Sequence, residues 1–264
     1  MFAETLAALI LAAQQIVIPF GHPKVNEQPR APIETSGPLW AAACQGSSDR
    51  NRAAPPVRIH ANSYLVGTCG LSSMLIVGDQ GDVLIDGGEA GDADLISANI
   101  RELGYSPSDI RYILHSDTDA GHLGGIAKLQ RMSGATIVAS PGGAALLRRG
   151  SGDEIPLAEA GRIVRDGDEV RLGNILLTAI ASPSGGLSWR WVSCETGICR
   201  TIVYAASRVP GDSATAASIA AGPCEILVTA MPAASEMVKR LVVGQPLFDQ
   251  GACKAYATQE SAPQ

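Results

Sequence analysis

Short apolar runs separated by turn residues make up most of the chain from residue 57 onward. In residues 58–88 these runs favour strands, and the polar stretch GDQGD at residues 78–82 lies between two of them, which predicts a β-hairpin. Residues 92–105 instead repeat apolar side chains at helical spacing, with an aspartate near the start and Gly104 near the end. This second pattern predicts a helix.

The next segments continue the alternation of strand and helix patterns. Residues 110–116 form an apolar run typical of a buried strand, residues 121–134 carry apolar side chains on one helical face, and residues 135–140 return to a strand pattern. This order predicts an α/β fold. The polar run DTDAGH, residues 117–122, then lies where a strand ends and a helix begins, which is a usual place for sites in α/β sheets.

The second half of the chain contains mostly strand patterns. They cover residues 161–182, 187–193, 199–207 and 224–232, and residues 235–244 are expected to form a final helix. Two comparable halves, each a sheet with helices, predict a layered sandwich with the helices outside. Trp189 and Trp191 alternate within one strand pattern and should share a strand face, and the alternative is that they line a pocket.

The first 56 residues differ in pattern from the rest. Residues 1–20 hold an apolar run of signal-peptide length without a basic start or a small-residue cleavage pattern, so we expect an atypical signal segment. Glutamines and a proline interrupt this run, which argues against a stable membrane span. Residues 21–56 are rich in proline, glycine and polar residues and are expected to form an extended leader. Residues 57–264 are long enough for one domain with one core.

Charge and cysteine usage narrow the possible partners and the compartment. The net charge of -6 and the pI of about 5.2 give no general basic surface, so nucleic acid is excluded as an expected partner. The six cysteines form no CxxC pair, and an even number without metal spacing favours disulfides and a periplasmic or secreted protein.

The residues alone suggest one local cysteine pair. Cys194 and Cys199 bracket the short loop ETGI, so a disulfide between them can close easily. The partners of the other four remain open, and these are Cys44, Cys69, Cys224 and Cys253. One alternative is free buried cysteines in a cytosolic protein. Another makes Cys44, in the sequence WAAAC, a lipid attachment site.

Asp117, Asp119 and His122 bring two carboxylates and an imidazole onto one short turn, so they are candidate metal ligands. The structural alternative is that one aspartate caps the following helix and His122 is a residue of its first turn. A calcium loop of the EF-hand kind is excluded, because His122 stands at the required glycine and Lys128 at the twelfth position.

Two further polar residues could approach this turn. Asp86, in the sequence DGG, is expected to shape a turn, although it could also approach a metal. His115 is expected to be packed or to act behind the ligands, because side chains alternate along the strand that carries it.

The order of these segments is similar to that of a known family. Residues 56–257 make up roughly three quarters of the chain. In this range the segments occur in the order VGTCGLSSMLI, VLIDGG, ANIRELGY, IRYILHS, GGLSWRWVSCETGIC and CEILVTAMP. In words and order they resemble a metallo-β-lactamase of the third subclass, B3. The resemblance implies an αββα four-layer sandwich, a periplasmic setting and the disulfides Cys44–Cys69, Cys194–Cys199 and Cys224–Cys253.

The resemblance also implies two zinc ions, and here the sequence departs from the family. Ser182 stands where the family segment GHTPGG has a zinc-binding histidine, and Met231 stands where T-P-H-P has another. Ser207 matches a serine that in the family helps to hold a substrate carboxylate. Only the last ligand of the family motif H-x-H-x-D-H, at His122, keeps its residue type in this chain. The motif corresponds here to Asp117, Thr118, Asp119, Ala120, Gly121 and His122.

A histidine count supports the same conclusion. The chain has four histidines and none lies beyond residue 122, whereas a dinuclear centre of the family's type needs five. Losing an outer-shell partner alone weakens metal affinity by about 10- to 100-fold, so tight binding of two zinc ions is not expected. We expect at most one weakly bound divalent metal, zinc or manganese, at Asp117, Asp119 and His122.

Three functions are compatible with this sequence. The leading hypothesis is a noncatalytic or strongly impaired homologue that keeps the scaffold and a pocket for an unidentified small molecule. The first alternative is a hydrolase of β-lactams or of other amides or esters that uses one metal at DTDAGH. The second is an envelope protein that binds a macromolecule through an exposed apolar patch. The sequence predicts no oligomeric state.

Overall fold

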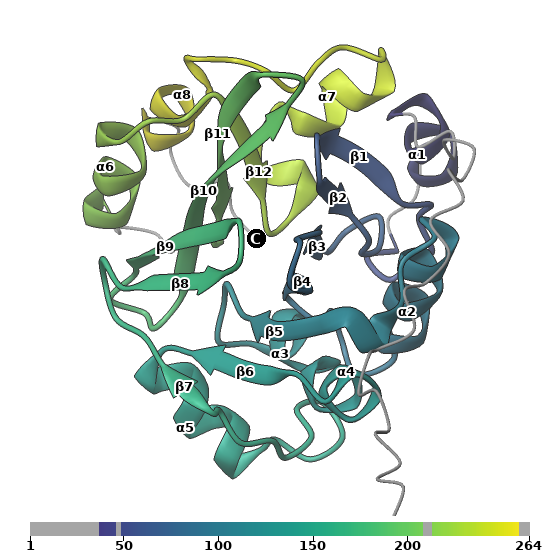
Figure 1. The fold of residues 1–264 in the computed structure, drawn as a ribbon, viewed down its shortest axis with the longest axis vertical. Coiled ribbons are helices and arrows are strands. Elements are labelled where there is room, and N and C mark those ends of the chain that lie inside the picture. Colours follow the sequence, from purple (N-terminus) through teal and green to yellow (C-terminus); the bar gives the residue numbers. More distant parts are fainter. Residues whose placement is uncertain (1–36, 46–48, 208–212, 259–264) are drawn as a thin grey trace, which may run out of the picture. The chain divides into compact units, whose positions relative to one another are not determined.

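Two β-sheets form the centre of the molecule (Figure 1). The structure is a computed structural model that describes residues 37–45, 49–207 and 213–258, all of which belong to one compact unit. The signal segment expected at residues 1–20 lies outside the described residues. No helix in the described ranges is both long enough and apolar enough to span a membrane.

The first sheet has seven strands in sequential order, from β1 to β7. The strands from β1 to β4 pair antiparallel, and those from β4 to β7 pair parallel. The β3–β4 pair confirms the hairpin predicted at GDQGD. The strands are β1 (Val57–His60), β2 (Ser63–Leu65), β3 (Met74–Ile76), β4 (Asp82–Ile85), β5 (Ile110–Leu114), β6 (Thr136–Ala139) and β7 (Arg162–Ile163).

The second sheet has five strands in the order β12-β11-β10-β9-β8. Its strands pair antiparallel except for β11 and β12, which are parallel. The parallel pair puts the carboxyl ends of β11 and β12 at the same edge of this sheet. The strands are β8 (Glu169–Leu172), β9 (Ile175–Ala181), β10 (Leu187–Glu195), β11 (Ile198–Ala205) and β12 (Ile226–Thr229).

Helices cover the outer face of each sheet (Figure 1). One apolar cluster lies between the sheets and includes Met74 and Trp189, while Ile96 and Ile219 belong to separate clusters under the outer helices of the first and second sheets. This layering confirms the predicted αββα sandwich. The outer helices are α2 (Ala93–Glu102), α4 (Ile126–Ser133), α5 (Pro141–Arg149), α6 (Ser213–Ala221) and α8 (Ala252–Thr258).

The two tryptophans of β10 lie in the core between the sheets, as the alternation predicts. Trp189 Nε1 donates to the carbonyl of His115 at 2.9 Å, and Trp191 Nε1 donates to Ser63 Oγ at 3.1 Å. Each indole therefore buries its ring while its N–H still finds an acceptor. Through these bonds β10 is tied to the first sheet, and Trp189 reaches the strand end that leads into DTDAGH.

A helix lies inside the range that we predict to be an extended leader, so the prediction for residues 21–56 is wrong at this point. Helix α1 spans Gly37–Cys44. A proline in its first turn and a run of alanines favour helix, and Trp40 is buried against the core between the sheets. The segment is too short to show a clear helical period, and the buried tryptophan supplies the missing stabilisation.

The helix predicted at residues 235–244 is present as α7 (Met237–Val242), but it is not the last one. After α7 the chain forms α8, which buries Cys253 and Tyr256. Those two side chains pack in the cluster beneath the second sheet's outer helices. A seven-residue helix depends on such packing more than on its own sequence pattern, which explains why the pattern did not reveal it.

The helix predicted at residues 121–134 is divided into α3 (Ala120–Leu123) and α4 by two glycines. A Cβ atom on Gly125 would lie 2.0 Å from the carbonyl oxygen of Gly87, so only glycine allows this approach of two backbones. Gly87 N also donates to the carbonyl of His122 at 2.9 Å. The break between the two helices therefore lets α3 pack closely against the DGG turn that follows β4.

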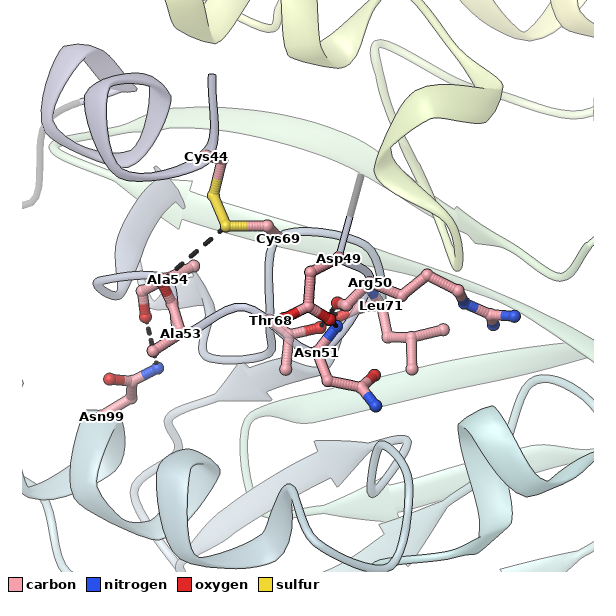
Figure 2. The surroundings of a disulfide bond; sticks show 10 residues. All are labelled: Cys44, Asp49, Arg50, Asn51, Ala53, Ala54, Thr68, Cys69, Leu71 and Asn99. Carbon is pink, nitrogen blue, oxygen red and sulfur yellow. Dashed lines mark hydrogen bonds between the residues drawn. A yellow bond between two sulfur atoms is a disulfide. The ribbon is translucent and has the colours of Figure 1, made fainter. Parts of the chain in front are cut away.

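Three disulfides hold the described residues, and they are the pairs that the resemblance implies: Cys44–Cys69, Cys194–Cys199 and Cys224–Cys253. The first joins the end of α1 to the loop between β2 and β3 (Figure 2). It rules out both alternatives for Cys44, the free thiol and the lipid attachment. The second lies across the β10–β11 hairpin, where the two cysteines are directly opposite each other.

Candidate functional site

The site begins where β5 ends, in the loop that leads from His115 to α3. Asp119 is the N-cap of α3, with an extended backbone and a side-chain oxygen that accepts from Gly121 N at 2.7 Å. The capping role proposed as the structural alternative is therefore real for Asp119. It does not exclude a second role, because the cap places this carboxylate directly beside the first turn of α3.

Three side chains meet at this helix start, as the sequence predicts. Asp117, Asp119 and His122 each offer an atom, and these atoms lie within 4.8 Å of one another. His122 Nδ1 is 2.8 Å from Asp119 Oδ1, and its Nε2 is 3.9 Å from Asp117 Oδ2. The imidazole is 1% exposed and its Nε2 is buried without a hydrogen-bond partner.

Asp86 lies beneath this group and acts on the loop through hydrogen bonds. It follows β4 with a φ of 66°, and its carboxylate accepts from Ser116 N at 2.6 Å and from Ser116 Oγ at 2.5 Å. The Tyr204 hydroxyl donates at 2.7 Å to Asp86 Oδ2, the oxygen that also accepts from Ser116 Oγ. Asp86 is fully buried, and it joins the ends of β4, β5 and β11. This agrees with the structural role expected for it.

Burial and neighbouring charges shift the pKa values of the site's side chains in opposite directions. Burial alone would lower the pKa of His122, but the carboxylates of Asp86, Asp119 and Asp117 outweigh it and raise that pKa to about 9. Burial raises the pKa of Asp86 to about 6 and also raises the pKa of Asp117. For Asp119 burial acts upward, yet the hydrogen bond and charge of His122 leave its pKa below the usual value.

His115 is a packed residue and does not belong to the group. Its ring is fully buried, Nε2 accepts from Ser140 N at 3.0 Å, and Nδ1 lies 3.2 Å from the carbonyl oxygen of Asp117. Burial lowers its pKa to about 4, so the ring is neutral at pH 7. Both ring nitrogens are therefore occupied by backbone groups, and His115 shapes the loop rather than offering a ligand atom.

Of the other residues predicted near Asp117, Asp119 and His122, one bonds directly to this group and two lie in neighbouring turns. Ser207 N donates to Asp117 Oδ2 at 2.7 Å, and hydrogen bonds from both the backbone and the side chain of Ser207 act to lower the pKa of Asp117, so this residue reaches the site. Ser182 begins a turn after β9, where its hydroxyl lies 2.8 Å from Ser184 Oγ. Met231 follows β12 and precedes the short helix η2 (Pro232–Ala234). The backbone of each residue bonds locally: Ser182 N donates to the carbonyl of Gly186 at 2.9 Å, and the Met231 carbonyl accepts from Thr229 Oγ1 at 2.7 Å.

Arg50 also borders the site, and no pattern in the sequence predicts it there. A Cβ atom on Gly121 would lie 3.2 Å from Arg50 Nη2 and 3.1 Å from Asp119 Oδ1. Arg50 comes from the loop after α1, within the range predicted to be an extended leader. No local pattern marks it, because its neighbour at the site is 71 residues away along the chain, from position 50 to position 121.

The residues present do not fit a dinuclear zinc centre. Such a centre needs several nitrogen or sulfur donors, and the group contains a single imidazole with two carboxylates. Asp119 Oδ1 is also already engaged by Gly121 N and by His122 Nδ1. Asp117, Asp119 and the unpartnered Nε2 of His122 could at most hold one ion, and carboxylate oxygens suit manganese or magnesium better than zinc.

Comparison with known proteins gives consistent matches. A family model described as the metallo-beta-lactamase superfamily matches residues 66–188. The solved structure of the MIM-2 metallo-β-lactamase is 39% identical, covers 84% of this chain and 93% of its own, and has a TM-score of 0.78. MIM-1 from Novosphingobium pentaromativorans is 38% identical, with coverages of 83% and 92% and a TM-score of 0.77.

A third similar structure carries the subclass in its description. MEM-A1, a subclass B3 metallo-β-lactamase isolated from a soil metagenome library, is 34% identical to this chain. The match covers 79% of this chain and 93% of that one, with a TM-score of 0.70. The similarity therefore extends over nearly the whole length of each of these enzymes.

Proposed function

The chain belongs to the metallo-β-lactamase superfamily, and from that premise we propose that it is a B3-like homologue whose dinuclear zinc centre has been lost. In this proposal the protein is noncatalytic or strongly impaired as a β-lactamase, and it keeps the scaffold and a pocket for a small ligand. We place it in the periplasm or outside the cell, because its disulfides persist in oxidising compartments.

The observation that carries the proposal is the hydrogen bond between His122 and Asp119. The only imidazole of the group points one nitrogen at a carboxylate that also caps α3, with 2.8 Å between Nδ1 and Oδ1. Side chains that would be metal ligands thus stabilise each other and the helix start. Ser182 and Met231 offer neither an imidazole nor a carboxylate to replace what is missing.

One observation favours the alternative of a single-metal hydrolase. His122 Nε2 has no partner, and it faces Asp117 Oδ2 across 3.9 Å. Asp117, Asp119 and His122 would then hold the ion, and Ser207 would contact a ligand beside it.

The alternative of a macromolecular partner has less support, because the exposed large apolar side chains of the described residues lie elsewhere, at Leu39, Leu157, Ile163, Val192, Ile198, Val242, Val243 and Phe248.

The proposal predicts that the purified protein does not hydrolyse β-lactams. With zinc added, we expect the hydrolysis of a chromogenic cephalosporin to stay within about twofold of the protein-free rate. The physical reason is that water outside a zinc site keeps a pKa far above neutral, whereas the pKa of zinc-bound water falls to about 7, so no hydroxide nucleophile forms at neutral pH. Absorbance at saturating substrate measures this directly.

Two variants interpret any activity that does appear. His122→Ala removes the imidazole of the site, and His60→Ala removes an imidazole from β1 as the matched control. Activity that His122→Ala abolishes and His60→Ala preserves would support the single-metal hydrolase and contradict the proposal. Activity that survives His122→Ala would show that this residue group is not the source.

A further inference from the structure

The space beside Gly121 is bordered by a guanidinium. The position of a Cβ atom there is 3.2 Å from Arg50 Nη2, 3.1 Å from Asp119 Oδ1 and 3.2 Å from Leu71 Cδ2. The motif H-x-H-x-D-H of the family that the chain resembles has an aspartate at this position. A positively charged side chain therefore lies beside the point where the side chain of a metal ligand would begin.

The backbone that carries Arg50 is firmly attached to the loop between β2 and β3 (Figure 2). The carbonyl of Arg50 accepts from Gly70 N at 2.9 Å and from Thr68 Oγ1 at 2.7 Å. Cys69, between these two, donates from its N to the carbonyl of Arg52 at 3.0 Å and forms the disulfide with Cys44. These tertiary contacts therefore fix the backbone from which the Arg50 side chain extends.

The guanidinium of Arg50 is not held by other side chains of the described residues. In the parts of the chain that the structure describes, it forms no hydrogen bond and no ion pair within 4.0 Å. Figure 2 shows the side chain extending away from the disulfide. A guanidinium is charged at every physiological pH, so its charge near Asp119 is permanent.

We infer that Arg50 takes the place of a second metal ion as the fixed cation of this site and thereby lowers the site's affinity for divalent cations. The inference rests on the proposed function, since it explains how the site persists without a dinuclear centre. A divalent ion among Asp117, Asp119 and His122 would lie close to a permanent positive charge and would be repelled by it. Arg50 and the Asp119 carboxylate are exposed, so water and salt screen part of this repulsion.

The test is a zinc titration of the full chain by isothermal titration calorimetry. Arg50→Gln removes the charge and keeps most of the side-chain length, Arg50→Lys keeps the charge, and Arg52→Gln removes the same charge two positions away as the control. We expect Arg50→Gln to bind zinc at least about tenfold more tightly than the original protein, which corresponds to about 1.4 kcal/mol. Arg50→Lys and Arg52→Gln should stay within about twofold of it.

Two different failures can be told apart in this experiment. If Arg50→Gln and the original protein bind zinc equally weakly, the inference is wrong and the proposed function stands. If the original protein already binds two zinc ions tightly, the proposed function is wrong as well. A second readout, the rise in melting temperature on adding zinc, should be larger for Arg50→Gln than for Arg52→Gln, and equal shifts would again overturn the inference.

Discussion

Replacing Asp86 with alanine is expected to lower the free energy of unfolding by about 3–5 kcal/mol, the largest effect of any single substitution at this site. The fully buried carboxylate accepts two hydrogen bonds from Ser116 and lies 2.7 Å from the Tyr204 hydroxyl. Alanine would leave these buried groups without a partner and open a small cavity. Chemical denaturation, followed by circular dichroism, measures the change.

Two variants control this prediction. Asp86→Asn keeps the shape and one acceptor, so we expect a smaller loss of about 1–2 kcal/mol. Asp153→Ala removes an exposed carboxylate from a turn far along the chain, and a change within about 0.5 kcal/mol is expected. The structural role of Asp86 is wrong if Asp86→Ala is as stable as Asp153→Ala.

Removing the Cys224–Cys253 disulfide is expected to cost about 3–4 kcal/mol, whereas removing Cys194–Cys199 should cost about 2 kcal/mol or less. The first closes a separation of 29 residues and the second a separation of only 5. A longer closed loop restricts the unfolded chain more, so its loss destabilises more. Cys253 is also buried in the cluster with Tyr256, which adds lost packing when it becomes alanine.

The comparison uses two double variants, Cys224→Ala/Cys253→Ala and Cys194→Ala/Cys199→Ala, in thermal or denaturant unfolding. The second is a matched control because both of its cysteines are exposed and the β10–β11 pair keeps its backbone hydrogen bonds without them. Equal losses in the two variants, or a larger loss in the hairpin variant, would contradict the expected order.

Much of the fold follows from local patterns in the sequence. Residues 110–140 show a buried strand, an amphipathic helix and a second strand, and the structure places β5, α4 and β6 there. The hairpin at GDQGD and the shared face of the two tryptophans follow in the same way. These features depend on periodicity and turn chemistry, which a single sequence displays.

Other features depend on contacts between distant residues and were not visible. The break between α3 and α4 exists because Gly125 approaches Gly87, and α8 forms because Tyr256 packs under the second sheet. Arg50 reaches Gly121 only after the loop after α1 is attached to the loop between β2 and β3. Periodicity carries no information about such tertiary approaches.

The candidate site, too, has features that the sequence predicts and features that depend on tertiary contacts. The gathering of Asp117, Asp119 and His122 follows from their spacing at a helix start, and the structure brings them together. The direction of each side chain does not follow from spacing. That Asp119 caps α3 and holds His122 Nδ1, while Nε2 stays unpartnered, depends on how α3 is pressed against the DGG turn.

The most direct test of the central claim is a count of bound metal ions. The full chain is equilibrated with zinc and separately with manganese, dialysed, and measured by mass spectrometry for ions per chain. We expect far less than one retained zinc ion per chain, because a single imidazole and two carboxylates already engaged in hydrogen bonds form a weak site. Two retained zinc ions per chain would contradict it.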